Sequence, residues 1–466
     1  MFKFLYQENK KKIFSQIIII IIAAAAYLPF INKFSYTFDD WYLMWAGEVY
    51  GWQSFQAIYS IDRPLRAYVM MPEYIIFGQN AIWYNIFAWC FRVLSALALN
   101  WILNRIWPNV TRYSLWITIM YIVYPGFLSQ TNGIDYQAQM ISLSAAMISI
   151  ALTIYSISEK VPAKKWAAMV FSILLGWIYL GLVEYEIGFE FFRLLFVYFL
   201  PGKSDEKFFN HIIYTIRNWL PYLLIPIGFL TWRLFIFQAE RKATDINVQL
   251  GTLVSAPVVT AYQWVQQLFT SSRNVLFYAW IIPLRQLKQY IQPVDIILLF
   301  IFTVGIIYLV SKIVENISIS SPSTKIYEIM TWGFLSAIIA IIPIILVNRS
   351  VSFPYYSRYS LVSSIGTSIF LVSLFYMTRN KWVINIGLGI LLLAALVSNN
   401  TNSRQAARST QQMNNFWWQV SWRAPQIEKN TTIITSYQSA PLLEDYFIWG
   451  PANLIYFPTK LSEEYM

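Results

Sequence analysis

Apolar residues run in long blocks along most of this chain, and short polar segments separate the blocks. A helix needs roughly 17–25 predominantly apolar residues to cross the hydrocarbon core of a bilayer, and by that length the pattern predicts about eleven transmembrane helices. The basic, alanine-rich start also fits a signal peptide, but its apolar stretch is long, so we expect an uncleaved first helix. The expected helices are 13–31, 82–106, 114–130, 137–157, 166–183, 187–200, 219–238, 294–312, 328–347, 359–377 and 382–398.

Composition supports an all-α polytopic membrane protein. Of the 466 residues, 57% are hydrophobic and 12% are charged, whereas soluble domains carry roughly 25% charged residues. The single cysteine, Cys90, excludes an internal disulfide. The single histidine, His211, falls in a predicted cytoplasmic loop, which argues against histidine catalysis or a His/Cys zinc site on the outer face.

The distribution of positive charge predicts the orientation. The net charge of +11 comes from 34 basic and 23 acidic residues. Because lysine and arginine hold loops in the cytoplasm, we interpret the excess as a topology signal and expect no nucleic-acid partner. The prediction is a multi-pass plasma-membrane protein with a cytoplasmic N-terminus and an extracytoplasmic C-terminus, and residue usage favours a bacterium. Basic residues gather in the segments expected inside: 1–12, 105–113, 158–165, 201–218, 313–327 and 378–381.

Three segments expected on the outer side are large. The first outer loop is 32–81, and the later one, 239–293, has broken apolar runs typical of helices that lie at the membrane interface. We therefore expect a transmembrane domain over 1–398 and a small extracytoplasmic C-terminal cap over 399–466. Residues 430–457 contain short β-rich runs punctuated by Pro and Gly, which favour strands in this cap.

Two adjacent carboxylates, Asp39 and Asp40, follow the first helix in the sequence FDDW. An aromatic, half-dry setting raises a carboxyl pKa toward values useful for a general base. Neighbouring residues point in different directions, so we expect one to face a cavity, beside Trp41, and the other to brace the loop. The alternative is that Asp simply caps a helix starting at Trp41. Both aspartates are catalytic candidates, and the sequence leaves open which is the base.

The same outer loop holds two arginines three residues apart, Arg63 and Arg66. They share a face if a helix starts at the intervening proline, Pro64, which suits a first-turn position. A guanidinium near the surface matches a phosphate, so both are candidates to bind a donor phosphate. The alternatives are contact with lipid headgroups or pairing with Asp62 and Glu73.

Three glutamates and an arginine cluster in GLVEYEIGFEFFR, between two predicted spans. Charged groups within a membrane usually pair, so a structural bridge between Glu190 and Arg193 is one expectation. The other is that Glu184 or Glu186 lines an outer cavity and contacts a sugar hydroxyl or a metal.

The last short outer loop contains Arg349 and Arg358 on either side of Tyr355 and Tyr356. Positive charge in a short outer loop runs against the usual bias. It therefore indicates an anionic partner, either a donor phosphate or lipid headgroups, with the tyrosines lining the cavity. Asp135 is a further candidate for the cavity wall, although a plain turn explains it as well.

Four short motifs carry a resemblance to a known group of enzymes. A first helix, a large outer loop that opens on an aspartate motif, many spans and an outer C-terminal part together resemble the GT-C superfamily of membrane glycosyltransferases. That superfamily includes protein O-mannosyltransferases, the lipid A aminoarabinose transferase and oligosaccharyltransferase. The motifs are Phe38-Asp39-Asp40-Trp41, Arg63-Pro64-Leu65, Tyr185-Glu186 and Ser357-Arg358-Tyr359.

The resemblance implies a GT-C fold and a specific chemistry. The first-loop aspartate would act as base toward an acceptor or would hold a divalent metal, and the sugar would arrive on a polyprenyl phosphate whose phosphate meets arginines. Asp39 matches the leading residue of the family's acidic pair. Asp40 departs from the glutamate that mannosyltransferases show, and the WWDYG-like signature of oligosaccharyltransferase is missing.

The resulting hypothesis is an inverting glycosyltransferase that moves a sugar from a polyprenyl-phosphate donor to an acceptor hydroxyl on the extracytoplasmic face. The acceptor is left open among glycan, lipid and protein, and membrane lipids surround the chain. No cofactor is required by the sequence; Mg²⁺ or Mn²⁺ on Asp39, Asp40 or Glu186 stays an option. The alternatives are a lipid or polysaccharide transporter or flippase, an oligosaccharide polymerase or ligase, and a non-catalytic assembly subunit.

Overall fold

The fold is helical throughout the part of the chain that the structure describes. The computed structural model describes residues 2–108, 110–200, 208–237, 246–313, 323–428, 430–435 and 445–457, and these residues contain helices and no strands. Nine helical segments within these ranges are long and apolar enough to cross a membrane. The expectation of an all-α polytopic membrane protein is therefore confirmed.

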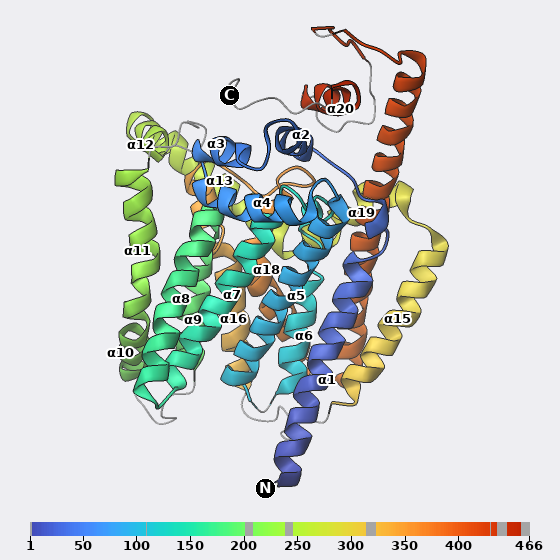
Figure 1. Ribbon diagram of the computed structural model, residues 1–466. Coiled ribbons are helices and arrows are strands. Elements are labelled where there is room, and N and C mark those ends of the chain that lie inside the picture. Colours follow the sequence, from blue (N-terminus) through green and yellow to red (C-terminus); the bar gives the residue numbers. More distant parts are fainter. Residues whose placement is uncertain are drawn as a thin grey trace.

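The long helices stand side by side as a bundle (Figure 1). Each corresponds to an apolar block of the sequence, and α10 and α11 belong to one membrane-spanning segment, Phe209–Ile236. The helices are α1 (Phe2–Tyr27), α5 (Ala81–Ile106), α7 (Gln137–Ser158), α8 (Pro162–Leu182), α10 (Phe208–Trp219) with α11 (Leu224–Thr231), α15 (Pro293–Ser311), α16 (Ser323–Ile339), α18 (Ser364–Tyr376) and α19 (Lys381–Arg423).

Two predicted spans form shorter helices inside the same bundle. The segment expected at 114–130 contains α6 (Thr111–Ile122), and the segment expected at 187–200 contains α9 (Phe189–Phe199). Both end just before a proline, Pro125 or Pro201, and proline cannot continue a helix because it lacks the N–H and clashes with the preceding turn. α6 and α9 still run along the bundle (Figure 1).

A layer of short helices covers one end of the bundle. The first outer loop folds into α2 (Asp40–Tyr50), α3 (Ser54–Ser60) and α4 (Pro64–Phe77), which lie at this end (Figure 1). The later outer loop forms α12 (Ile246–Ser255), α13 (Pro257–Leu276) and α14 (Ile282–Gln286). On α13 the apolar residues Val258, Tyr262, Val265 and Phe269 share one exposed face, as expected for a helix at a membrane interface.

The C-terminal part differs from the sequence-based prediction in two ways. α19 is one unbroken helix of 43 residues, so the boundary expected at 398/399 falls inside it. Residues 446–456 form a helix, α20 (Tyr446–Tyr456), where β-rich runs predicted strands. Tertiary packing explains the error, because α20 sets its aromatic side chains against α2: the ring centroids of Trp449 and Trp45 lie 5.0 Å apart. Residues 429, 436–444 and 458–466 of the predicted cap lie outside the described residues.

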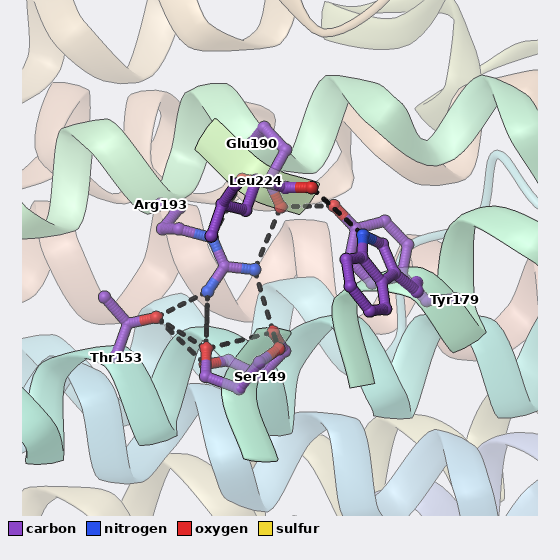
Figure 2. Close-up of polar contacts among 8 residues, drawn as sticks. Ser149, Thr153, Tyr179, Glu190, Arg193 and Leu224 are labelled. Atoms are coloured by element: carbon purple, nitrogen blue, oxygen red, sulfur yellow. Dashed lines mark hydrogen bonds and ion pairs between the residues drawn. The ribbon is translucent and has the colours of Figure 1, made fainter. Parts of the chain in front are cut away.

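A buried ion pair joins three helices in the interior of the bundle (Figure 2). Arg193 on α9 contacts Glu190 one turn earlier, with Nη2 and Oε1 2.9 Å apart. The same guanidinium donates to Ser149 and Thr153 of α7, while the hydroxyl of Tyr179 on α8 donates to the carboxylate of Glu190. The expected structural bridge between Glu190 and Arg193 is therefore confirmed, and further hydrogen bonds satisfy both of its charges.

Candidate functional site

A cavity of about 510 Å³ lies where α2, α19 and α20 meet, at the end of the bundle covered by the short helices. Segments far apart in the sequence build its wall. Five of the candidates named from the sequence line it: Asp39, Trp41, Asp135, Tyr355 and Arg358. The remaining lining residues are Tyr36, Thr37, Phe38, Leu128, Ser129, Thr131, Asn132, Tyr136, Gln286, Leu287, Pro354, Asn402, Gln405, Ala406, Ser409, Thr410, Met413, Tyr446 and Phe447.

Asp39 is half-buried at the edge of this cavity, directly before the first residue of α2. The hydroxyl of Tyr446 on α20 donates a hydrogen bond of 2.8 Å to its Oδ1. Burial and the nearby carboxylate of Asp135 raise the pKa of Asp39, while the Tyr446 hydrogen bond and the positive charges of Arg66 and Arg358 partly offset the rise. A raised pKa makes the carboxylate of Asp39 a stronger base than that of an exposed aspartate.

Asp40 does not line the cavity, which corrects its place among the catalytic candidates. Its side chain is only 1% exposed. It accepts hydrogen bonds from the backbone N–H groups of Thr37 and Asp135, at 2.9 and 3.0 Å. With its amide nitrogen turned toward the carboxylate, Asn132 donates to both oxygens, at 2.7 and 2.6 Å. Asp40 thus ties two loops together beneath the cavity, and Asp39 alone of the pair is accessible.

Arg358 supplies the positive charge of the cavity. It is half-buried in the 3₁₀ turn Ser357–Ser363, at the start of the span that continues into α18. Its Nη1 donates to the hydroxyl of Tyr136 at 2.9 Å, and its guanidinium lies over the ring of Tyr359, 5.0 Å from the centroid. These contacts hold the guanidinium in place. Tyr356 stacks on Tyr359 and does not line the cavity, although the sequence suggested that it would.

Arg66 is already paired with a carboxylate, so it differs from the expected phosphate ligand. Its Nη2 lies 3.0 Å from Oδ1 of Asp135 and also donates to the backbone carbonyl of that residue. The guanidinium lies over the ring of Tyr59, 5.0 Å from the centroid. Asp135 lines the cavity, whereas Arg66, which neutralises its charge, does not.

The two glutamates expected at the cavity lie elsewhere. Glu184 forms an ion pair with Arg233, with Oε1 and Nη2 3.0 Å apart. Glu186 is fully buried, where it accepts hydrogen bonds from Gln139 at 2.9 Å and from Ser142. Neither residue lines the cavity, so the interpretation of Glu184 and Glu186 as cavity residues is wrong for this cavity.

The remaining arginines of the sequence-based set are also outside the cavity lining. Arg63 lies 4.0 Å from Asp62, and its Nε is buried without a hydrogen-bond partner among the described residues. Arg349 is half-buried in the loop before the 3₁₀ turn. Only Arg358 of the four arginines therefore reaches the cavity itself.

The carboxylates proposed for a metal ion do not converge. Asp39 contacts Tyr446, whereas Asp40 and Glu186 are engaged by other protein donors. Within the described ranges, no group of three or more His, Cys, Asp and Glu side chains could hold a metal ion. Among the residues that the structure describes, the acidic side chains do not fit a divalent site.

No protein-family model matches the chain, and no curated protein matches it. Among solved structures, the chain is similar to the crystal structure of ArnT from Cupriavidus metallidurans in the apo state, with 12% sequence identity and a TM-score of 0.26. The similarity covers 90% of this chain and 83% of the ArnT chain. At this identity and TM-score, it carries no conclusion about function.

Several residues that line the cavity were not predicted from the sequence. Tyr446 lies 407 residues after Asp39, and no local pattern connects the two. The α19 residues had a visible signal: Asn402, Gln405 and Ser409 follow an apolar span at spacings of three and four, which places them on one helix face. A polar stripe that continues a membrane helix indicates a surface in contact with a polar cavity.

Proposed function

We propose that this protein is an inverting glycosyltransferase of GT-C type that moves a sugar from a polyprenyl-phosphate donor to an acceptor hydroxyl. The observation that carries the proposal is that Asp39 and Arg358 both line one cavity. The two charges are close enough for Arg358 to lower the pKa of Asp39. A base and a phosphate ligand are the two groups that this transfer needs.

The chemistry follows from these two residues. The acceptor oxygen forms a bond to the anomeric carbon while the bond from that carbon to the phosphate oxygen breaks. Asp39 takes the proton of the acceptor hydroxyl, and Arg358 meets the charge of the departing polyprenyl phosphate. Attack from the face opposite the phosphate inverts the anomeric centre. Because phosphate leaves readily once its charge is met, no second carboxylic acid is needed to protonate it.

The position of the cavity favours an enzyme over a transporter. Its wall is built from loops, from the first residues of α2 and α20 and from the middle of α19, at the end of the bundle that the short helices cover (Figure 1). Transporters bind their substrates near the middle of the membrane, between broken helices of two repeats. The positive-charge bias of the sequence predicts that the cavity end lies outside, and we propose that donor and acceptor meet at the extracytoplasmic surface.

A transfer assay tests the proposal. The purified protein is incubated in lipid nanodiscs with polyprenyl-phospho-sugars and a mixture of acceptors, and sugar transfer is measured by mass spectrometry. Loss of a general base costs about 10²–10⁴-fold in rate, and we expect that loss for Asp39→Asn. Glu159→Gln, which follows the opposite end of α7, is the control and should keep full activity. Full activity in Asp39→Asn would refute the proposal.

A further inference from the structure

The two sides of the cavity differ in chemistry. Aromatic rings from the first outer loop and from α20 form one side: Tyr36, Phe38, Trp41 and Phe447. Edge-to-face contacts hold these rings, with centroids 5.1 Å apart for Tyr36 and Trp41 and 5.9 Å apart for Phe38 and Phe447. Fixed aromatic rings offer apolar faces that cost little conformational entropy when a ligand binds.

Neutral hydrogen-bonding side chains from α19 form the other side. Asn402, Gln405 and Ser409 repeat at helical spacing, and Thr410 adds a second hydroxyl. The structure gives Gln405 no hydrogen-bond partner among the residues that it describes, and it is half-buried. This side therefore offers donors and acceptors that a bound ligand can use.

Two buried polar atoms, one on each side, lack a partner. Trp41 is 8% exposed and Thr410 is 9% exposed. The indole Nε1 of Trp41 and the Oγ1 of Thr410 have no hydrogen-bond partner within the described part of the chain. Leaving such groups unsatisfied is costly. Both residues line the cavity, so a ligand with hydroxyl groups can satisfy these covered atoms once the side chains turn toward it.

The charges in the cavity restrict the class of ligand further. Its ionisable carboxylates are Asp39 and Asp135, and its guanidinium is that of Arg358. Since Arg66 neutralises Asp135, one negative and one positive charge remain, and the proposed reaction uses both. No ionised side chain of the cavity would therefore remain to pair with a charged acceptor.

We infer that the acceptor is a neutral carbohydrate, bound between the aromatic side and the α19 side of the cavity. The inference rests on the proposed function. Sugar rings present apolar C–H faces to aromatic rings and hydroxyls to amides, so they match both sides. A peptide acceptor fits less well, because extended peptides are commonly recognised by addition to a strand edge and no strand occurs among the described residues.

Ligand binding in the absence of donor tests the inference. Neutral tetrasaccharides built from glucose, mannose, galactose or N-acetylglucosamine are titrated into the protein in nanodiscs, and binding is followed by saturation-transfer NMR. We expect saturable binding of at least one tetrasaccharide. Gln405→Met and Thr410→Val should weaken it about three- to tenfold, the effect of one lost hydrogen bond. Gln411→Met, an exposed position on the same helix, should bind as the wild type does.

The outcomes separate this inference from the function on which it rests. If no tetrasaccharide binds, or if Gln405→Met, Thr410→Val and Gln411→Met all bind like wild type, the carbohydrate assignment is wrong. Sugar transfer to a serine peptide or to diacylglycerol, with none to a saccharide, would likewise overturn it and leave the transferase standing. Saccharide binding without any transfer by the wild type would instead refute the transferase. Asp39→Asn should keep binding and lose transfer.

Discussion

Replacing Tyr446 by phenylalanine removes one hydroxyl from the cavity and keeps the ring that packs on α2. That hydroxyl donates to Oδ1 of Asp39 at 2.8 Å. A hydrogen bond to a charged group contributes about 1.5–3 kcal/mol, and water that reaches a half-buried carboxylate recovers part of this. Because this hydrogen bond stabilises the charged form, Tyr446→Phe should raise the pKa of Asp39.

The sign of the effect on activity follows from the role of Asp39 as base. Only the ionised carboxylate accepts a proton, so activity is lost as the pH falls through its pKa. Burial already raises this pKa, and the Tyr446 hydrogen bond holds it down. In Tyr446→Phe the acidic limb of the pH profile should therefore move to higher pH. At pH values above the acidic limbs of both proteins, kcat/KM for the acceptor should be higher in Tyr446→Phe than in the wild type. The reason is that the acceptor hydroxyl no longer competes with the tyrosine for Asp39.

The assay is the pH dependence of kcat/KM with saturating donor, measured for the wild type and Tyr446→Phe. Tyr456→Phe is the matched control on the same helix, because the Tyr456 hydroxyl donates to the carbonyl of Ala424 and lies outside the cavity lining. Its profile should equal that of the wild type. An acidic limb that stays in place, or moves to lower pH, in Tyr446→Phe would refute the assignment of Asp39 as the base held by this tyrosine.

Four further results are expected. Arg193→Met leaves Glu190 buried without its cation and should cost about 3–5 kcal/mol in stability, seen as earlier thermal unfolding in nanodiscs; an unchanged transition would contradict a buried pair. Asp40→Ala frees two backbone N–H groups and should lower the unfolding temperature by an amount equivalent to about 1–3 kcal/mol, whereas undiminished stability would argue against its bracing role. Arg358→Gln should lower kcat/KM for the donor about ten- to a hundredfold, the cost of one charge-assisted hydrogen bond; Arg349→Gln, outside the cavity lining, is the control, and equal losses would disprove the assignment. Chelation by EDTA should leave transfer unchanged, because the candidate carboxylates do not converge; loss of activity restored by Mg²⁺ would overturn this.

The membrane helices and one buried ion pair could be predicted from the sequence. Both depend on short-range patterns: a run of apolar residues long enough to cross a bilayer, and an acid and a base three positions apart on one helix face. Glu190 and Arg193 form their bridge for this reason. The segment 187–200 was already short for a span and contains α9, whereas 114–130 was predicted as a full span and contains the shorter α6, which ends before Pro125.

The candidate site could be predicted only in outline. The adjacency of Asp39 and Asp40 indicated that one would face a cavity and the other would brace a loop, and the structure agrees. Which residue takes which role depends on Asn132 and the backbone of Asp135, more than 90 positions later. No local pattern reports such contacts.

The clearest failure concerns the C-terminal part. Local composition favoured strands in residues 430–457, but packing against α2 decides that 446–456 are helical. Trp449 meets Trp45, and Tyr446 meets Tyr42, with ring centroids 5.7 Å apart. Such partners are separated by about the length of the whole chain, so the strand or helix propensity of a short segment gives no information about these contacts.

The continuity of α19 makes the cavity sensitive to the thickness of the surrounding bilayer. From the sequence we expect the membrane-spanning part of this helix to end near residue 398, and the same unbroken helix carries Ser409 in the cavity wall. At a rise of about 1.5 Å per residue, Ser409 stands roughly 16 Å beyond that point. A tilt change of about 10°, well within what hydrophobic mismatch produces, would swing this wall by about 3 Å. Acyl-chain length alone should therefore open or narrow the cleft beside Asp39, with no change to the protein.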